Sequence, residues 1–179
     1  DPGLWRCKMK TRGQAAQFLG GASMKAAYYE ANGSAREVLR VGEVDTPQPC
    51  AGEVRVKLAA SGVNPSDVKN RQGLTRKIAW PRVIPQSDGA GVIDAVGSGV
   101  PAARVGERVW IWNGQWKRPF GTAAEYIALP AAMAVPLPDK ISFAEGACLG
   151  IPAMTAYHAV ALAGLSQGSR VLVSGGAGA

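Results

Sequence analysis

Glu53-Val-Arg-Val-Lys-Leu58 decides the fold class, because apolar and charged side chains alternate strictly along it. The two valines and Leu58 share one face, and Arg55 and Lys57 share the other. Alternation of this kind is typical of a half-buried antiparallel strand, which has one face in a core and the other in water. The stretch therefore predicts a β protein, with Val54, Val56 and Leu58 as part of its core.

Six further runs flank this strand, and turn residues separate them. They cover residues 25–29, 38–44, 89–96, 108–112, 121–129 and 133–137. Short strands at this spacing predict an all-β barrel or sandwich, and we place it between residues 24 and 141.

The pattern changes after residue 141. Ser142 and Glu145 have the spacing of a capping box, which predicts a short helix near 143–149. Pro152 suits the first turn of a second helix, in which apolar residues fill two neighbouring stripes, so most of that helix is expected to be buried. His158 lies in these stripes, and the helical spacing favours a packed core residue over a metal ligand.

The last residues combine an apolar run, 171–173, with a glycine-rich turn made of Gly175, Gly176, Ala177, Gly178 and Ala179. Such a turn brings backbone N–H groups close to the pyrophosphate of a dinucleotide, but any glycine-rich turn after a strand looks similar. The run predicts a buried parallel strand, which needs neighbours and covering helices. Residues 142–179 are thus expected to be a helical connector and the start of a truncated α/β domain.

Residues 1–23 show neither strand alternation nor a helical stripe, so we expect an unstructured extension. They lack the apolar segment of a secretory signal peptide, and no apolar run in the chain approaches the length of a membrane span. Cys7, Cys50 and Cys148 are odd in number and far apart, which makes a poor disulfide framework. A reducing compartment, the cytoplasm, is therefore the default expectation.

The net charge of +7 would suit a polyanion partner. The basic residues are scattered, however, and gather only in small clusters at 69–71, 76–77 and 117–118. A dedicated nucleic-acid surface is therefore not favoured, and no membrane partner is expected.

Three segments, in the same order along the chain, resemble the zinc-less quinone oxidoreductase branch (the zeta-crystallin-like proteins) of the medium-chain dehydrogenase/reductase superfamily. Residues 60–67 (ASGVNPSD) resemble the active-site segment of that branch. Residues 87–100 (SDGAGVIDAVGSGV), followed by VGERV, match the barrel signature in glycine spacing. Residues 148–157 and 168–179 resemble the connector and the first cofactor turn. The resemblance implies a GroES-like β-barrel catalytic domain followed by the first strand of a truncated Rossmann domain.

The resemblance also places Asn64 and Ser87 where zinc-dependent alcohol dehydrogenases have a ligand Cys and a ligand His. A catalytic zinc takes three ligands from Cys, His and carboxylates, and neither an amide nor a hydroxyl suits it. Asp88 adds one carboxylate, which does not make a site. No metal is therefore expected, and an already electrophilic substrate suits an enzyme without a Lewis acid.

By the same resemblance, Asn64 lies beside nicotinamide and substrate, where its amide can donate to a carbonyl oxygen, and Thr155 contacts the nicotinamide. Asn64 can instead stabilise the turn before Pro65, and Thr155 can be a buried helix residue that bonds back to a carbonyl. Asp67 can orient Asn64 or cap the helix that starts there. The predicted site is Asn64 and Asp67 for catalysis, and Asn64, Thr155 and residues 175–179 for the cofactor.

The function implied by the resemblance is an NADPH-dependent, zinc-independent reductase of a small-molecule quinone or enone, active as a homodimer, with the chain as given inactive on its own. Lys69 and Thr75 stand where the branch often has tyrosines, so the substrate class stays open. Two alternatives also stay open. One is a non-enzymatic GroES-like binding module with a polyanion partner, and the other is a zinc alcohol dehydrogenase relative.

Overall fold

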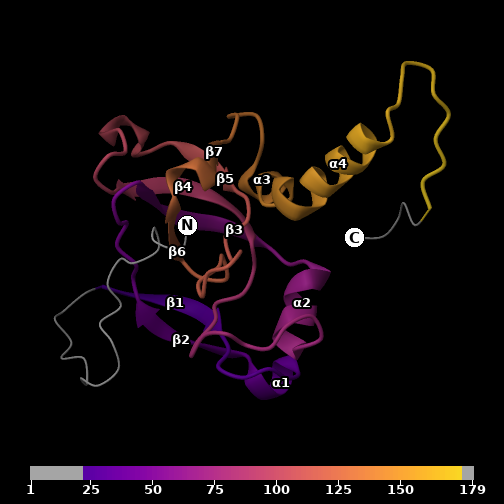
Figure 1. Ribbon diagram of the computed structural model, residues 1–179. Coiled ribbons are helices and arrows are strands. Elements are labelled where there is room, and N and C mark those ends of the chain that lie inside the picture. Colours follow the sequence, from indigo (N-terminus) through magenta and orange to yellow (C-terminus); the bar gives the residue numbers. More distant parts are fainter. Residues whose placement is uncertain (1–21, 175–179) are drawn as a thin grey trace.

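The computed structural model describes residues 22–174, which form two antiparallel sheets and several short helices (Figure 1). A ribbon of β1 (Ser23–Tyr28) and β2 (Arg40–Asp45) makes the smaller sheet. The larger sheet has the strand order β6-β3-β4-β5-β7. Its strands are β3 (Glu53–Gly62), β4 (Asp88–Val96), β5 (Arg108–Ile111), β6 (Tyr126–Pro130) and β7 (Ala134–Pro136).

The barrel core lies on the inner face of the larger sheet, as the sequence pattern predicts. Val54 and Val56 are fully buried, and Leu58 packs partly buried against the same cluster. The remaining buried members are Ile93, Val109, Ile111, Ile127, Leu129 and Ala134. Isolated bridges, among them Ala26 to Ala124, join the ribbon to the segment before β6. The prediction of a mostly β fold is confirmed.

Two glycines of the barrel signature are required by close backbone approach. A Cβ atom on Gly91 would lie 2.0 Å from the carbonyl oxygen of Lys57, and one on Gly97 would lie 1.7 Å from that of Cys50. No side chain fits at such distances, so this part of the signature reflects packing of strand against strand.

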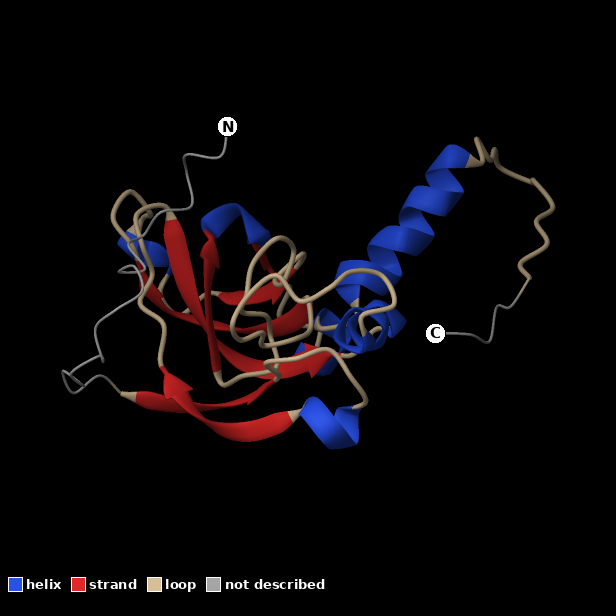
Figure 2. Ribbon diagram, turned by 60° about the horizontal axis from the view of Figure 1, so that its bottom comes forward, coloured by secondary structure: helices blue, strands red, loops and turns tan. Residues whose placement is uncertain are grey.

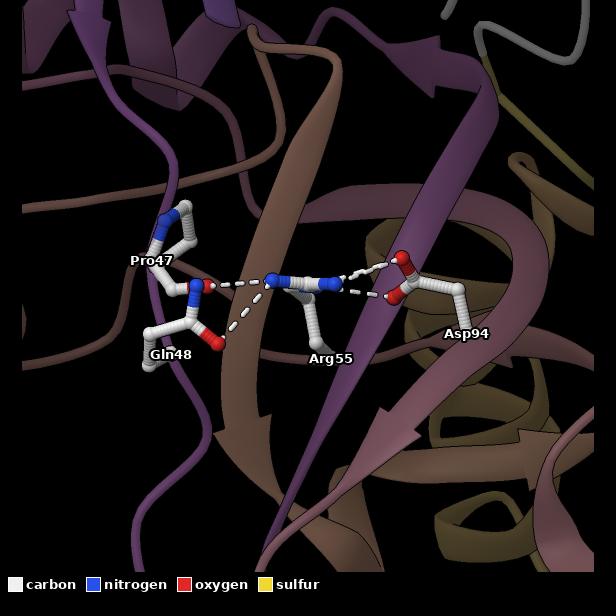
Figure 3. A network of polar contacts seen from close by, with 4 residues as sticks. All are labelled: Pro47, Gln48, Arg55 and Asp94. Atoms are coloured by element: carbon white, nitrogen blue, oxygen red, sulfur yellow. Dashed lines mark hydrogen bonds and ion pairs between the residues drawn. The ribbon is translucent and has the colours of Figure 1, made fainter. Parts of the chain in front are cut away.

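An arginine on the outer face of the sheet ties three segments together (Figure 3). Arg55 of β3 donates from Nε to Oδ1 of Asp94 on β4 at 2.9 Å, and from Nη2 to Oδ2 at 2.9 Å. Its Nη1 donates to the carbonyl of Pro47 and to Oε1 of Gln48, both at 3.2 Å. The outer face of the sheet is therefore only partly exposed to solvent at Arg55, because the segment after β2 covers it.

We expect Arg55→Met to lower the free energy of unfolding by roughly 2 kcal/mol, because it removes a bidentate charged pair that is partly buried and leaves Asp94 without its partner. Urea denaturation measures the change. Lys57→Met, on the same face of the same strand but exposed, is the matched control and should stay within about 0.5 kcal/mol. Equal effects of the two substitutions would contradict a structural role for the network.

Two strands begin later than the sequence pattern predicts. The run 38–44 gives a strand only from Arg40, because helix α1 (Ala35–Val38) comes first, with Oε2 of Glu37 accepting from the backbone N–H and hydroxyl of Ser34. The run 121–129 gives a strand only from Tyr126. Its first residues instead bond to the segment before β4, with Thr122 N donating to the carbonyl of Gln86 at 2.9 Å.

The helical connector is shorter and far more exposed than predicted. Helix α3 (Phe143–Gly146) ends before residue 149. A π-helical turn, η4 (Leu149–Ala153), contains Pro152 and leads directly into helix α4 (Met154–Leu162). Helix α4 projects away from the strands (Figure 2), and Tyr157 is 77% exposed. The prediction of a buried second helix is wrong for the described residues, since no described element packs along this helix beyond its first turn.

Residues 171–173 form no strand in the structure, and Leu172 is 94% exposed. A parallel strand needs a paired neighbour, and no described residue supplies one. The glycine-rich turn 175–179 and most of the predicted extension 1–23 lie outside the described residues; Ser23 already begins β1.

Cys148 is a free cysteine, whereas Cys50 is disulfide-bonded, so the expectation of a chain without disulfides is wrong at Cys50. Between residues 22 and 174 no helix has the length and apolar character needed to cross a membrane.

Candidate functional site

Asn64 contacts two acidic side chains, and it lies between the end of β3 and the start of helix α2 (Pro65–Gln72). It is the N-cap of this helix and is only 6% exposed. Its backbone N–H donates to Oδ2 of Asp67 at 2.8 Å, and its side-chain Nδ2 donates to Oδ2 of Asp88 at 2.8 Å. Asp67 thus completes a capping box at the start of α2 by accepting from the backbone N–H of Asn64; it does not contact the side-chain amide.

Asp88, the first residue of β4, joins the barrel to the connector. It is fully buried, and both of its carboxylate oxygens lie 3.0 Å from the backbone nitrogen of Ile151, which donates to them. The connector can approach this closely because residue 150 is glycine: a Cβ atom there would lie 2.1 Å from Oδ1 of Asp88. Asp88 therefore fixes the position of Asn64 on one side and of η4 on the other.

Burial governs the electrostatics of this cluster. It raises the pKa of Asp67 to about 6, the hydrogen bond from Asn64 opposes the rise, and the charge of Asp88 adds to it. Burial likewise raises the pKa of Asp88, against the hydrogen bonds from Asn64 and Ile151. Neither carboxylate has an ion-pair partner among residues 22–174. The site is thus a pair of buried acids on one asparagine, in which Asp67 accepts from the backbone N–H of Asn64 and Asp88 accepts from its side-chain amide.

The raised pKa of Asp67 makes stability depend on pH. The folded state holds a proton on Asp67 that the unfolded chain loses above about pH 4, so this contribution is complete below that pH and is lost as the pH rises through about 6. The unfolding free energy of the unmodified chain should therefore fall by about 2 kcal/mol more than that of Asp67→Asn between about pH 4 and 7.

Urea denaturation across this pH range tests the prediction. Asp45→Asn, which alters an exposed aspartate at the end of β2, is the control and should follow the unmodified chain. Parallel pH profiles for the unmodified chain and Asp67→Asn would show that burial does not shift this group.

Thr155 lies on the exposed first turn of α4, beside a cavity of about 270 Å³ that Trp112, Gly150 and Ile151 also line. Its side chain is not buried, which removes the alternative of a packed threonine bonded back to a carbonyl. Asn64 does not line this cavity, but Asp88 links it to Ile151, which does. Asp88 thus joins Asn64 to the turn that precedes Thr155, without touching Thr155 itself.

His158 is also exposed, and the prediction of a core histidine is wrong. It lines the cavity beside Thr155 and a second one of about 430 Å³, which Trp110 and Tyr157 also line. Both cavities exist because α4 is covered only at its start. Within the described part of the chain, no three His, Cys, Asp or Glu side chains gather in a way that could hold a metal ion.

The residues that organise the site are largely not predictable from the sequence. The sequence pattern presents Asp88 only as a possible metal ligand, and it does not distinguish Gly150 or Ile151. The sequence does contain a signal for Asp88, because an acid begins the otherwise small and apolar run 88–93. Burying a carboxylate without hydrogen-bond partners costs free energy, so an acid at this position indicates such partners. Gly150 had no comparable signal, because its need for glycine arises from a contact 62 positions away in the chain.

Known proteins share the sequence pattern and the fold of this chain. Residues 50–139 match the family model described as "Alcohol dehydrogenase GroES-like domain". The chain is 35% identical over 162 residues to 2-methylene-furan-3-one reductase of Solanum lycopersicum, a match that covers 88% of this chain and 42% of the relative.

Two solved structures extend the likeness. A quinone oxidoreductase from Coxiella burnetii superposes with a TM-score of 0.73 at 27% identity, covering 82% of this chain and 47% of the other. A mycobacterial protein complexed with NADPH superposes with a TM-score of 0.65 at 28% identity, covering 77% and 40%. The chain thus spans less than half the length of each of these proteins.

Proposed function

This chain belongs to the alcohol dehydrogenase GroES-like domain family, in the quinone oxidoreductase branch of the medium-chain dehydrogenase/reductase superfamily. We propose that the whole protein is an NADPH-dependent, zinc-independent reductase of a quinone or an α,β-unsaturated carbonyl. One observation carries the proposal: Asp88 holds the amide of Asn64 and the connector that bears Thr155 in one buried hydrogen-bonded unit. The substrate class is supported by the similarity to a 2-methylene-furan-3-one reductase and to a quinone oxidoreductase.

Asn64 is the group of this chain that acts on the substrate. Its amide nitrogen carries two hydrogens, and Asp88 accepts one of them. The second is free to donate to a carbonyl oxygen of the substrate, where negative charge develops as hydride arrives at carbon. Asp88 is a positioning residue, because rotation of the amide would remove one of the few hydrogen bonds that this buried carboxylate accepts.

The cavity beside Thr155 fits the nicotinamide end of the cofactor. It combines the ring of Trp112, the hydroxyl of Thr155 and the side-chain amide of Asn113, which suit a flat ring that carries a carboxamide. NADPH, when bound, supplies the hydride. The roles of this chain are to orient the ring and to exclude water on the barrel side. We also propose that residues 175–179 bind the pyrophosphate of the cofactor through their backbone N–H groups, and that the whole protein is a homodimer.

The test is an assay of NADPH oxidation by the protein expressed from its complete reading frame, with a neutral quinone and an enone as acceptors. The proposal expects saturable oxidation with at least one of them and little or none with simple ketones. The 179-residue chain alone is expected to be inactive. Oxidation of simple alcohols or ketones in preference to quinones and enones would contradict the proposal.

Zinc analysis separates this function from that of a zinc alcohol dehydrogenase. The amide of Asn64 and the single buried carboxylate of Asp88 offer at most a poor ligand set. Protein purified without chelator should therefore contain well under one zinc ion per chain. Stoichiometric zinc that is lost in an Asp88→Asn variant would contradict the prediction.

A second candidate is a polyanion-binding module, and one contact favours it. Arg76 and Lys117, from two of the basic clusters, lie 5.6 and 5.8 Å from the ring centre of the exposed Trp116. A ring between two cations suits a stacked base beside phosphates. Steeply salt-dependent retention on single-stranded DNA, lost in Trp116→Ala, would favour this alternative.

A further inference from the structure

A cavity of about 290 Å³ lies between the β1–β2 ribbon and strand β6. Its walls are mostly apolar and include Met24, Ile84, Tyr126 and Ile127. The ribbon and helix α4 lie on opposite sides of the molecule (Figures 1 and 2). Neither Asn64 nor Asp88 lines this cavity, which shares no lining residue with the cavity beside Thr155.

Arg118 places a charged group at this cavity without a full set of partners. Its Nη2 donates to the carbonyl of Ala128, whereas its Nη1 is buried and has no hydrogen-bond partner among residues 22–174. A guanidinium stays protonated in a protein, even though burial lowers the pKa of Arg118. A buried charge without a counter-ion is costly, so this side chain favours an anion beside it.

The other charges around the cavity do not meet this need. Arg82 is paired with Glu30 at 2.7 Å and lies over the ring of Tyr28, 4.4 Å from its centre. Asp45 is exposed to solvent at the end of β2 and forms no ion pair with Arg118 in the described chain. Glu53, the first residue of β3, acts on Arg118 through its charge but forms no ion pair with it in the described chain, so Nη1 still lacks a partner.

A second unpartnered polar atom lies close by in the chain. The hydroxyl of Thr46 is the other side-chain group between residues 22 and 174 that is buried without a hydrogen bond, and its neighbours Asp45 and Pro47 both line the cavity. A mostly apolar cavity that is lined by an arginine without its full set of hydrogen-bond partners has the composition of a ligand site rather than of a packed core.

We infer that this cavity binds a small apolar carboxylic acid as its anion, with the carboxylate on Nη1 of Arg118 and the apolar body against Met24, Ile84 and Ile127. A carboxylate matches the planar donors of a guanidinium better than a spherical anion does. The volume is at the lower end for ligand pockets, which suits an acid of the size of benzoate.

Isothermal titration calorimetry with benzoate and its neutral isostere benzamide tests the inference on the 179-residue chain. Benzoate is expected to bind at one site, roughly ten-fold or more tighter than benzamide, because a charged hydrogen bond is made only by the carboxylate. Arg118→Met should remove this preference, and Arg36→Met, an exposed arginine on α1, should leave it unchanged.

The pair of ligands keeps the test decisive if Arg118→Met does not fold, since benzoate and benzamide are compared on the unmodified chain. Equal affinity for the two ligands would overturn the inference. So would a benzoate preference that survives in a folded Arg118→Met variant, because the anion would then bind at another basic surface.

Discussion

Asn64→Asp is expected to lower the free energy of unfolding by about 3 kcal/mol at neutral pH, although the new side chain has the same shape. The amide that donates to Asp88 at 2.8 Å becomes a carboxylate, so two like charges face each other in a buried site. They cannot both be ionised there, and one must hold a proton whose pKa is raised. Stability should therefore recover as the pH falls towards about 5.

Urea denaturation at several pH values measures this effect, and the matched control lies on the same helix. Asn70 accepts hydrogen bonds from Thr75 and Arg76 through Oδ1, so Asn70→Asp keeps its acceptor next to a cation and should change stability by less than about 0.5 kcal/mol. A folded Asn64→Asp variant as stable as Asn70→Asp at neutral pH would show that Asn64 does not donate to a charged Asp88.

Gly150→Ala should have an effect of similar size for a steric reason. The added methyl carbon would lie 2.1 Å from Oδ1 and 2.6 Å from Cγ of Asp88, so the connector must move and Ile151 must withdraw its N–H from the carboxylate. We expect a loss of about 3 kcal/mol, or roughly 10 °C in Tm.

Gly42→Ala is the control for the glycine substitution. Gly42 lies in strand β2, and its added Cβ would lie no closer than 3.5 Å to Tyr28, an ordinary contact. Its Tm should stay within a few degrees of that of the unmodified chain. If Gly150→Ala is equally mild, the connector is not held against Asp88 as the structure has it.

The barrel was predictable because its signals are local. Strict alternation placed Val54 and Val56 in the core, and the spacing of Gly91 and Gly97 reflected backbones that touch. Strand starts were less predictable, since helix α1 forms through a bond between Ser34 and Glu37 that competes with the strand pattern.

The apolar pattern of α4 predicted burial, but a stripe shows only that a helix suits a partner and not that the described chain provides one. Tyr157 and His158 are exposed for that reason. In the site, Asn64 and Asp67 were recognisable from their segment, whereas the partnership of Asn64 with Asp88 arises from β3 and β4 pairing side by side, which no spacing in the sequence reveals.

The most direct test of the account is to follow the hydrogen that the proposed reaction transfers. The protein expressed from its complete reading frame is incubated with an enone, a zinc chelator and NADPH that carries two deuterium atoms at the reactive carbon of nicotinamide, so that either face transfers the label. The account predicts that the reduced product contains one deuterium on carbon, and that the chelator does not lower the rate. A product without the label, or a reduction that stops when zinc is removed, would contradict metal-independent hydride transfer by this protein.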